Sequence, residues 1–123
     1  MHEGDAYEAF REGTSLLESD NAHAAVIRLE RARSLEPEQG SVREALARAY
    51  YRTGRYAAAE EEFEAALAID PVNDYAHFGI GLCRLKAGDR NGARGHLRQA
   101  TVMRPDNADD RAALETAGDA EDA

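Results

Sequence analysis

Three prolines divide this chain into equal steps, because Pro37, Pro71 and Pro105 are each 34 residues apart. Other positions keep the same step. They form two columns of alanine, one of large apolar residues and one of small residues: Ala25, Ala59 and Ala93; Ala32, Ala66 and Ala100; Leu29, Phe63 and Leu97; Gly13, Ala47 and Gly81. Several columns in one register predict an array of structural repeats with this period.

The apolar periodicity inside a repeat is that of an α-helix. The middle repeat carries two stripes with helical spacing: Val42, Ala45, Leu46, Ala49, Tyr50, and then Tyr56, Ala59, Phe63, Ala66, Leu67. Gly54 separates the stripes and Pro71 follows them, and both residue types are typical of helix ends. Each repeat is therefore predicted to be helix, turn, helix, and the fold to be all-α. The alanine columns would let neighbouring helices cross closely.

The register divides the chain into five segments. We expect three repeats, a short capping helix and an acidic flexible tail, at residues 6–39, 40–73, 74–107, 108–117 and 118–123. The capping helix is expected because Arg111 and Leu114 repeat the spacing of Arg43 and Leu46, and because a solenoid end must cover its apolar face.

Glycines make the third repeat different from the other two. Gly79, Gly81, Gly92 and Gly95 fall inside its expected helices, and each costs about 1 kcal/mol relative to alanine in an exposed helix. Gly81 belongs to the small-residue column. Gly79 has no such packing reason in the sequence, so either a ligand backbone approaches it or the glycine is simply tolerated. We expect this repeat to open first.

The charge balance excludes two classes of partner. The formal net charge is −9, whereas proteins that bind nucleic acids or anionic membranes usually present a basic surface. No run approaches the ~20 apolar residues of a membrane helix, and the acidic N-terminus does not resemble a signal peptide. The single cysteine, Cys83, fits a reducing compartment. A cytoplasmic location is expected, and arginine usage, with Lys86 as the one lysine, suggests a bacterial source.

No pattern in the sequence indicates catalysis, a cofactor or a metal site. The histidines, His2, His23, His77 and His96, include no pair at the i, i+4 spacing of a helical metal site. Phosphate-binding loops, nucleophile elbows and dinucleotide motifs are absent. We therefore expect no enzyme activity, and we interpret His77 and Cys83 as packing residues.

The repeats resemble the signature of the tetratricopeptide repeat (TPR) family. The middle repeat has the favoured residue types at Leu46, Ala47, Tyr50, Ala59, Phe63, Ala66 and Pro71, and departs at Arg43. The outer repeats depart at Ala9, Glu12, His77 and Arg84. The resemblance covers about 100 of the 123 residues. It implies a right-handed α-α superhelix whose concave groove is lined by the first helix of each repeat.

The resemblance also implies that another polypeptide lies in this groove. The implied groove residues are Tyr7, Phe10, Thr14, Leu17, Glu44, Arg48, Tyr51, Arg52, Tyr75, Phe78, Leu82, Leu85 and Lys86. They include five of the eight aromatic residues, and three cations against one acid, which suits a peptide or helix with apolar anchors and some acidic residues. Alternatively, several of these aromatics pack between helices.

One known ligand class does not fit these positions. Some TPR domains clamp the C-terminal carboxylate of chaperones with Lys, Asn and Arg side chains. The matching positions here hold Phe10, Thr14, Ala45, Tyr75 and Gly79, and none of these side chains is a cation or an amide. We predict that acidic chaperone tails do not bind through such a clamp.

Two charged features are expected to have structural roles. The run Glu60-Glu61-Glu62 is interpreted as a solvated helix face. Arg84 stands where the family favours tyrosine, and we expect it to lie along the capping helix and pair with Glu115 or Asp110.

The sequence thus favours a non-catalytic protein-interaction module, such as an adaptor, a scaffold or a chaperone-like holder. The alternative is a structural homo-oligomer that assembles through the thinly capped C-terminal end, in which case Leu114→Asp would abolish a dimer.

Overall fold

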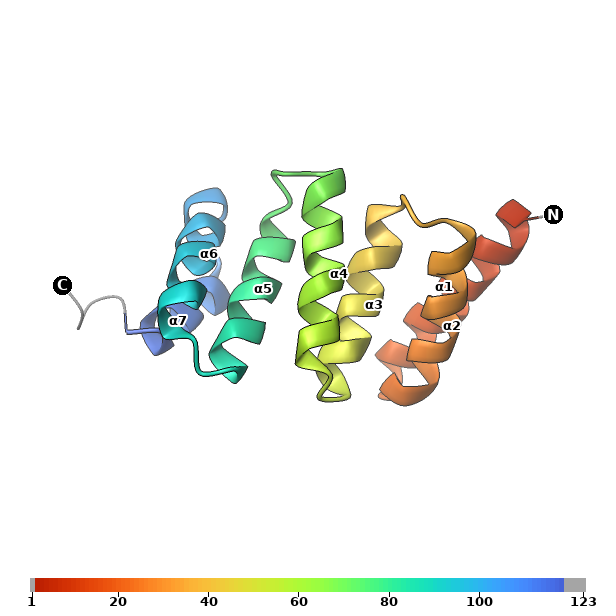
Figure 1. Ribbon diagram of the computed structural model, residues 1–123, viewed down its shortest axis with the longest axis horizontal. Helices are drawn as coiled ribbons and strands as arrows, with labels where there is room; N and C mark the ends of the chain where they lie inside the picture. Colours follow the sequence, from red (N-terminus) through yellow and green to blue (C-terminus); the bar gives the residue numbers. More distant parts are fainter. Residues whose placement is uncertain (1, 119–123) are drawn as a thin grey trace.

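The computed structural model describes residues 2–118, whose regular structure is entirely α-helical. The helices are α1 (His2–Glu18), α2 (Ala22–Leu35), α3 (Gly40–Arg52), α4 (Tyr56–Ile69), α5 (Asp74–Lys86), α6 (Arg90–Met103) and α7 (Ala108–Thr116). They follow one another along the long axis of the molecule, with α1 and α7 at opposite ends (Figure 1). The predicted all-α solenoid is confirmed.

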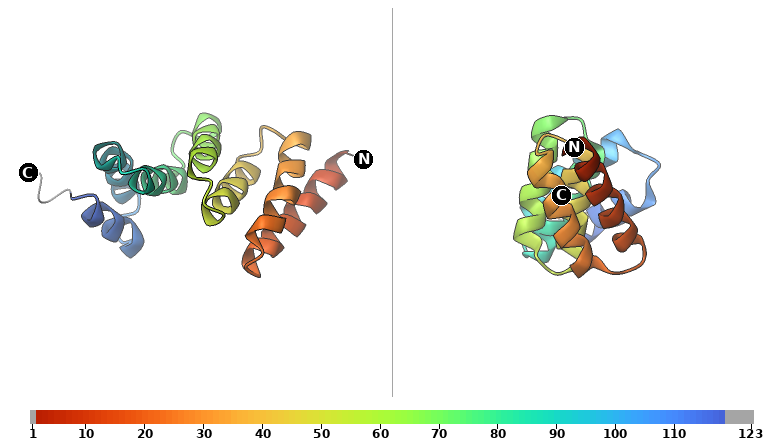
Figure 2. Two further views of the ribbon diagram at one scale, coloured as in Figure 1. Left: turned by 60° about the horizontal axis from the view of Figure 1, so that its bottom comes forward. Right: turned by 90° about the vertical axis from the view of Figure 1, so that its right-hand side faces the viewer.

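Helix contacts define the concave side of this solenoid. Helices α1 and α2, α3 and α4, and α5 and α6 form hairpins, and the second helix of each hairpin packs on the first helix of the next. The first helices also touch in series, α1 with α3, α3 with α5 and α5 with α7, whereas α2, α4 and α6 make no such contacts within residues 2–118. The row of first helices is therefore the tighter, inner row. Figure 2 shows the hairpins stepping along the molecule.

The turn inside each hairpin uses one left-handed residue. Gly54 and Gly88 have φ of 81° and 82°, and Asp20 takes the same place in the first hairpin with φ of 64°. In the middle hairpin the N–H of Arg55 reaches back to the carbonyl of Tyr50 over 2.8 Å, which satisfies a carbonyl left over at the helix end. Glycine carries no Cβ penalty in this conformation, and aspartate tolerates it better than most other residues.

Each hairpin contributes one large apolar residue to the core, and this residue packs with one glycine and one alanine. Leu29 lies with Gly13 and Ala45, Phe63 with Gly79 and Ala47, and Leu97 with Gly81 and Ala113. The expectation that Gly79 lacks a packing role is therefore wrong. A β-carbon built on Gly79 would overlap the Phe63 ring, just as one built on Gly13 or Gly81 would overlap the leucine packed against it.

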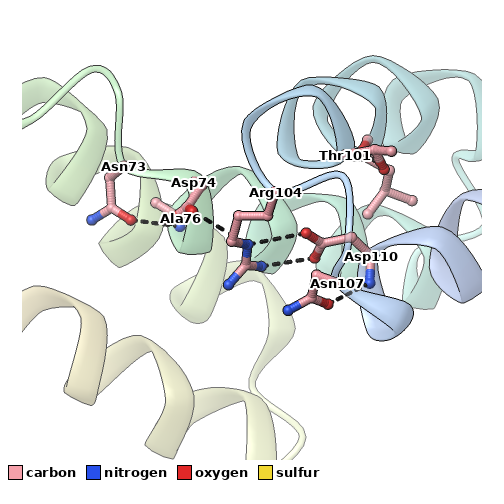
Figure 3. Close-up of polar contacts among 8 residues, drawn as sticks. Asn73, Asp74, Ala76, Thr101, Arg104, Asn107 and Asp110 are labelled. Carbon is pink, nitrogen blue, oxygen red and sulfur yellow. Dashed lines mark hydrogen bonds and ion pairs between the residues drawn. The ribbon is translucent and has the colours of Figure 1, made fainter.

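The cap is held by both apolar and ionic contacts. Ala113 of α7 and Ala117, the residue that follows this helix, join Ala93 and Leu97 of α6 in one buried cluster. Beside it, Asp110 is 0% exposed and accepts two hydrogen bonds from Arg104, from Nε over 3.0 Å and from Nη2 over 2.7 Å. Figure 3 shows Arg104 between Asp110 of α7 and Asp74 of α5. One guanidinium thus links the last three helices.

Two predicted charge roles are wrong. Arg84 does not pair with the cap. Its Nε lies 2.9 Å from Glu60 and its Nη1 lies 2.9 Å from Asp89. The acidic run on α4 is not one solvated face, because Glu62 is only 5% exposed and binds two arginines, Arg33 of α2 and Arg43 of α3. Long side chains from neighbouring hairpins reach these carboxylates, and such contacts leave no mark in a local sequence window.

No helix within residues 2–118 is both long enough and apolar enough to span a bilayer. Apart from Gly118, the predicted acidic tail lies outside the described residues.

Candidate functional site

Two connected hollows on the concave side bring most of the predicted groove residues together. The first is a cavity of about 100 Å³ lined by residues of α3, α4 and α5: Arg48, Tyr51, Arg52, Phe63, Tyr75, Phe78, Gly79 and Leu82. The second is more open and is lined by residues of α1, α3 and α5: Phe10, Thr14, Ser41, Glu44, Ala45, Arg48 and Tyr75. Arg48 and Tyr75 line both hollows, so these two side chains mark the boundary between them.

Aromatic rings form the wall of the first hollow. The Phe63 and Tyr75 rings meet edge to face, with centroids 6.0 Å apart, and the Tyr75 and Phe78 centroids are 6.3 Å apart. Because Gly79 lacks a side chain, the Phe63 ring packs directly against α5. Such contacts fix the ring positions, which makes the hollow a preformed apolar pocket.

The charged residues of the groove differ in how they are held. Glu44 accepts a hydrogen bond of 2.7 Å from the side-chain amide of Asn73, and Arg52 donates one of 2.7 Å to the carbonyl of Leu17. Lys86 lies over the Tyr56 ring, 5.8 Å from its centroid. Half-buried Arg48 lies between the two hollows and is hydrogen-bonded to the Tyr75 side chain. It is the cation best placed for a ligand that enters both.

The Tyr75 hydroxyl stays protonated near neutral pH. Burial raises its pKa, against the opposing effect of nearby Arg48. A protonated phenol can donate as well as accept a hydrogen bond. Tyr75 and Arg48 together therefore place donors at the boundary between the hollows.

Four predicted groove residues line neither of these hollows. Leu17 is 1% exposed and belongs to the main core, so its assignment to the groove is wrong. Leu85 packs half-buried against the core of α6 and α7, and Lys86 lies at the exposed end of α5. Tyr7 lines a separate hollow near the start of α1 and is 64% exposed. The aromatics Phe10, Tyr51, Tyr75 and Phe78 are half-buried, so each both packs and lines a hollow.

The structure adds Ser41, Ala45, Phe63 and Gly79 to the predicted set. The repeat register could have found Ser41, because it shares a column with Tyr7 and Tyr75. Phe63 could not be found in this way, since it comes from a second helix and reaches the groove only past Gly79.

Among the side chains of residues 4–118, no three of the metal-binding types converge on one point. Cys83 is buried, as predicted, and burial raises the pKa of its thiol to about 12. The thiol is therefore protonated and unreactive at neutral pH.

Comparison with known proteins agrees with this architecture. The sequence profile described as Tetratricopeptide repeat matches residues 10–74 and 45–109. The chain therefore belongs to the tetratricopeptide repeat family. No curated protein matches it at the sequence level.

Solved structures show the same fold at low identity. The Arabidopsis OM64 TPR domain is 20% identical with a TM-score of 0.91, covering 95% of this chain and 97% of that one. The first TPR of Spaghetti (RPAP3), bound to an HSP90 peptide, is 18% identical with a TM-score of 0.90, covering 98% and 95%. The Yersinia enterocolitica secretion chaperone SycD, in complex with a peptide of the translocator YopD, is 14% identical with a TM-score of 0.82, covering 91% of each chain.

Proposed function

We propose that this protein is a non-catalytic interaction module that holds an extended peptide or a helix of another protein in its concave groove. The observation that carries the proposal is the position of Arg48, a half-buried cation between an aromatic pocket and a more polar hollow. Solved structures of the same fold contain peptides of other proteins, which supports a role in binding rather than in catalysis.

The two hollows suggest how a ligand would be arranged. An apolar side chain would fill the pocket between Tyr51, Tyr75 and Phe78, while an acidic group beside it would pair with Arg48. A carboxylate can accept two parallel hydrogen bonds from a guanidinium, which sets orientation as well as affinity. Arg52 is hydrogen-bonded to a backbone carbonyl within the protein. Arg48 is hydrogen-bonded to the Tyr75 side chain, but a guanidinium has five N–H donors, so the ligand's acidic group is expected at Arg48, which lines both hollows.

The groove is not expected to bind chaperone tails as a carboxylate clamp does. The clamp positions hold Phe10, Thr14, Ala45, Tyr75 and Gly79, and these residues do line the two hollows. None of their side chains supplies the cationic or amide donors that fix a terminal carboxylate. The peptides SRMEEVD and SGPTIEEVD, present in two structures of this fold, should therefore show no binding through these five positions. A complex in which a clamped carboxylate contacts them would contradict this.

The proposal is tested by selecting peptides from a displayed random library with the wild-type protein. Selected peptides should share an acidic residue close to an apolar one. Arg48→Gln should weaken their binding by about tenfold or more, because a hydrogen bond to a charged group contributes roughly 1.5–3 kcal/mol. Phe78→Ala should weaken it through loss of the pocket wall, provided that circular dichroism shows a folded protein.

Arg31→Gln is the matched control, because it removes the same charge from an exposed position on α2. It should leave peptide binding unchanged. Equal binding by the wild type, Arg48→Gln and Phe78→Ala would show that the peptide lies outside these hollows.

The remaining parts of the proposal are a cytoplasmic location in a bacterium and partners that are neither nucleic acid nor membrane. The alternative, assembly through the C-terminal end, gains little support from the cap. Leu114 points into the cluster around Leu97, and none of the exposed large apolar side chains of residues 4–118 lies on α7. Leu114→Asp would therefore disturb the cap itself, and sedimentation of the wild type is the better test of a dimer.

A further inference from the structure

One pair of contacting positions in the repeat register holds different residue types in the second and third repeats. In the second, Arg43 of α3 binds Glu62 of α4 over 2.9 Å. The residues 34 positions later are His77 of α5 and His96 of α6, and their Nδ1 atoms are 3.1 Å apart. The two rings are tilted by 31°, with centroids 5.4 Å apart. A permanent ion pair is thus replaced by a pair of titratable groups.

The contact between two imidazole nitrogens depends on one lone pair. A bond between the Nδ1 atoms requires one ring to donate N–H and the other to accept. A first proton can enter at Nε2 of the donor ring and leave this bond intact. A second proton must enter at the accepting Nδ1, and two positively charged rings would then face each other with N–H against N–H. The contact therefore tolerates one added proton but not two.

The surroundings do not compensate for a second charge. Both histidines are half-buried. Burial, then His77 and then Arg84 lower the pKa of His96, and Glu60 of α4 opposes them only in part. The Glu60 carboxylate is already bound by Arg84 over 2.9 Å.

Charged groups of the cap are also engaged with other partners. On α7, Asp110 is bound by Arg104 over 2.7 Å. Arg111, which occupies the next place in the register after His77, donates to the carbonyl of Pro105 over 2.7 Å. Neither side chain is therefore directed to the histidine pair as a neutralising partner.

We propose that His77 and His96 form a proton-sensitive contact between α5 and α6, so that the third repeat loosens as the solution is acidified. The second repeat does not loosen, because the ion pair of Arg43 and Glu62 occupies the same two positions there. The sign follows from linkage. The neutral form of His96 is favoured in the folded state, so its contribution to stability is present above the unfolded value of about pH 6.5 and is lost as the pH falls through the lower folded value.

Loosening α5 would also reach the groove. Tyr75 and Phe78 flank His77 on α5 and form the wall of the apolar pocket. If the proposed function holds, acidification should release the ligand. This consequence rests on that function, whereas the opening of the repeat does not.

Hydrogen exchange of the free protein at pH 7.5 and pH 5.5, corrected for intrinsic exchange rates and run with EDTA to exclude metal bridging, tests the proposal. The equilibrium constant for opening of α5 and α6 should rise by up to about tenfold from pH 7.5 to pH 5.5. This is the limit when one histidine must stay neutral in the folded state and is free to bind a proton in the open state. Helices α3 and α4 should change much less. No peptide is present, so the result is independent of ligand binding.

Variants assign the effect to the pair. His77→Arg with His96→Glu copies the second repeat and should abolish the extra opening at pH 5.5, and His96→Gln, which cannot become charged, should do so too. His23→Gln, at an exposed site on α2, is the matched control and should behave as wild type. The proposal is overturned if α5 and α6 respond to pH no more than α3 and α4, or if the response persists in both pair variants.

Discussion

The buried carboxylate of Asp110 makes the cap unusually sensitive to one substitution, Arg104→Ala. Asp110 is 0% exposed, while the Arg104 side chain keeps 27% of its surface in water and also lies 3.3 Å from Asp74. Removing Arg104 leaves an uncompensated charge in the core, at a cost of about 3–5 kcal/mol. A chain of this length is stabilised by roughly 6–18 kcal/mol in total. The variant should therefore lose a large part of the stability of its C-terminal end.

Removing the other partner should cost less. In Asp110→Ala the guanidinium of Arg104 can turn to Asp74 and to solvent, so no charge is left buried. The earlier repeats carry Val42 and Ala76 at this place in the register, which shows that an apolar side chain fits there. We expect a loss of about 1–3 kcal/mol. The double variant should be more stable than Arg104→Ala alone, because the orphaned charge is gone.

Urea denaturation followed by circular dichroism gives the order of stabilities, and hydrogen exchange of α7 shows where the loss occurs. Arg104→Lys is the conservative control, since it keeps the charge but not the paired hydrogen bonds. The reasoning is refuted if Asp110→Ala is as destabilising as Arg104→Ala, or if the double variant is the least stable of the three.

Three smaller predictions follow from local geometry. Gly79→Ala should destabilise the protein by about 1–3 kcal/mol, because the new methyl group overlaps Phe63. Gly95→Ala should stabilise it by about 0.5–1 kcal/mol, because the space around Gly95 is open. Thermal denaturation of the two variants tests both predictions. Cys83, whose pKa is raised to about 12, should react with a thiol reagent only after denaturation. The backbone N–H of Gly92, at the start of α6, donates to Asp89 and lowers the pKa of this carboxyl. The stabilising effect of the Asp89 carboxylate should therefore be lost only at a pH below the ordinary pKa of aspartate. Asp89→Ala should remove this part of the dependence of stability on acid pH.

Periodicity was enough to predict the helices and the core, because both depend on the positions of apolar residues along one helix. The buried column of Leu29, Phe63 and Leu97 is an example. The groove was only partly predictable. Phe10 and Arg48 face the hollows, whereas Leu17, about two turns beyond Phe10 on α1, enters the core.

The polar contacts were the least predictable part. Glu62 looks like any other glutamate in an acidic run, and its burial depends on Arg33 and Arg43, which approach from two other helices. The contact of His77 with His96 escaped for the same reason, because the two residues are far from i, i+4 in sequence. In both cases the repeat register relates the partners, since 43 with 62 and 77 with 96 are the same pair of positions.

The charges beside the concave helices cannot be inferred from the net charge of the chain. Acidic side chains close to the concave helices are already engaged: Glu44 by the amide of Asn73, and Asp74 and Asp110 by Arg104. Asn73 also accepts the N–H of Ala76 over 3.0 Å and so caps α5, which means that one residue both starts the helix carrying the pocket wall and holds the acid beside it. The net charge of −9 therefore says little about what the groove attracts. The polarity of the hollows depends on which charges are bound within the fold. Under the proposed function, an acidic ligand residue would meet Arg48, whose guanidinium has more N–H donors than its hydrogen bond to Tyr75 uses.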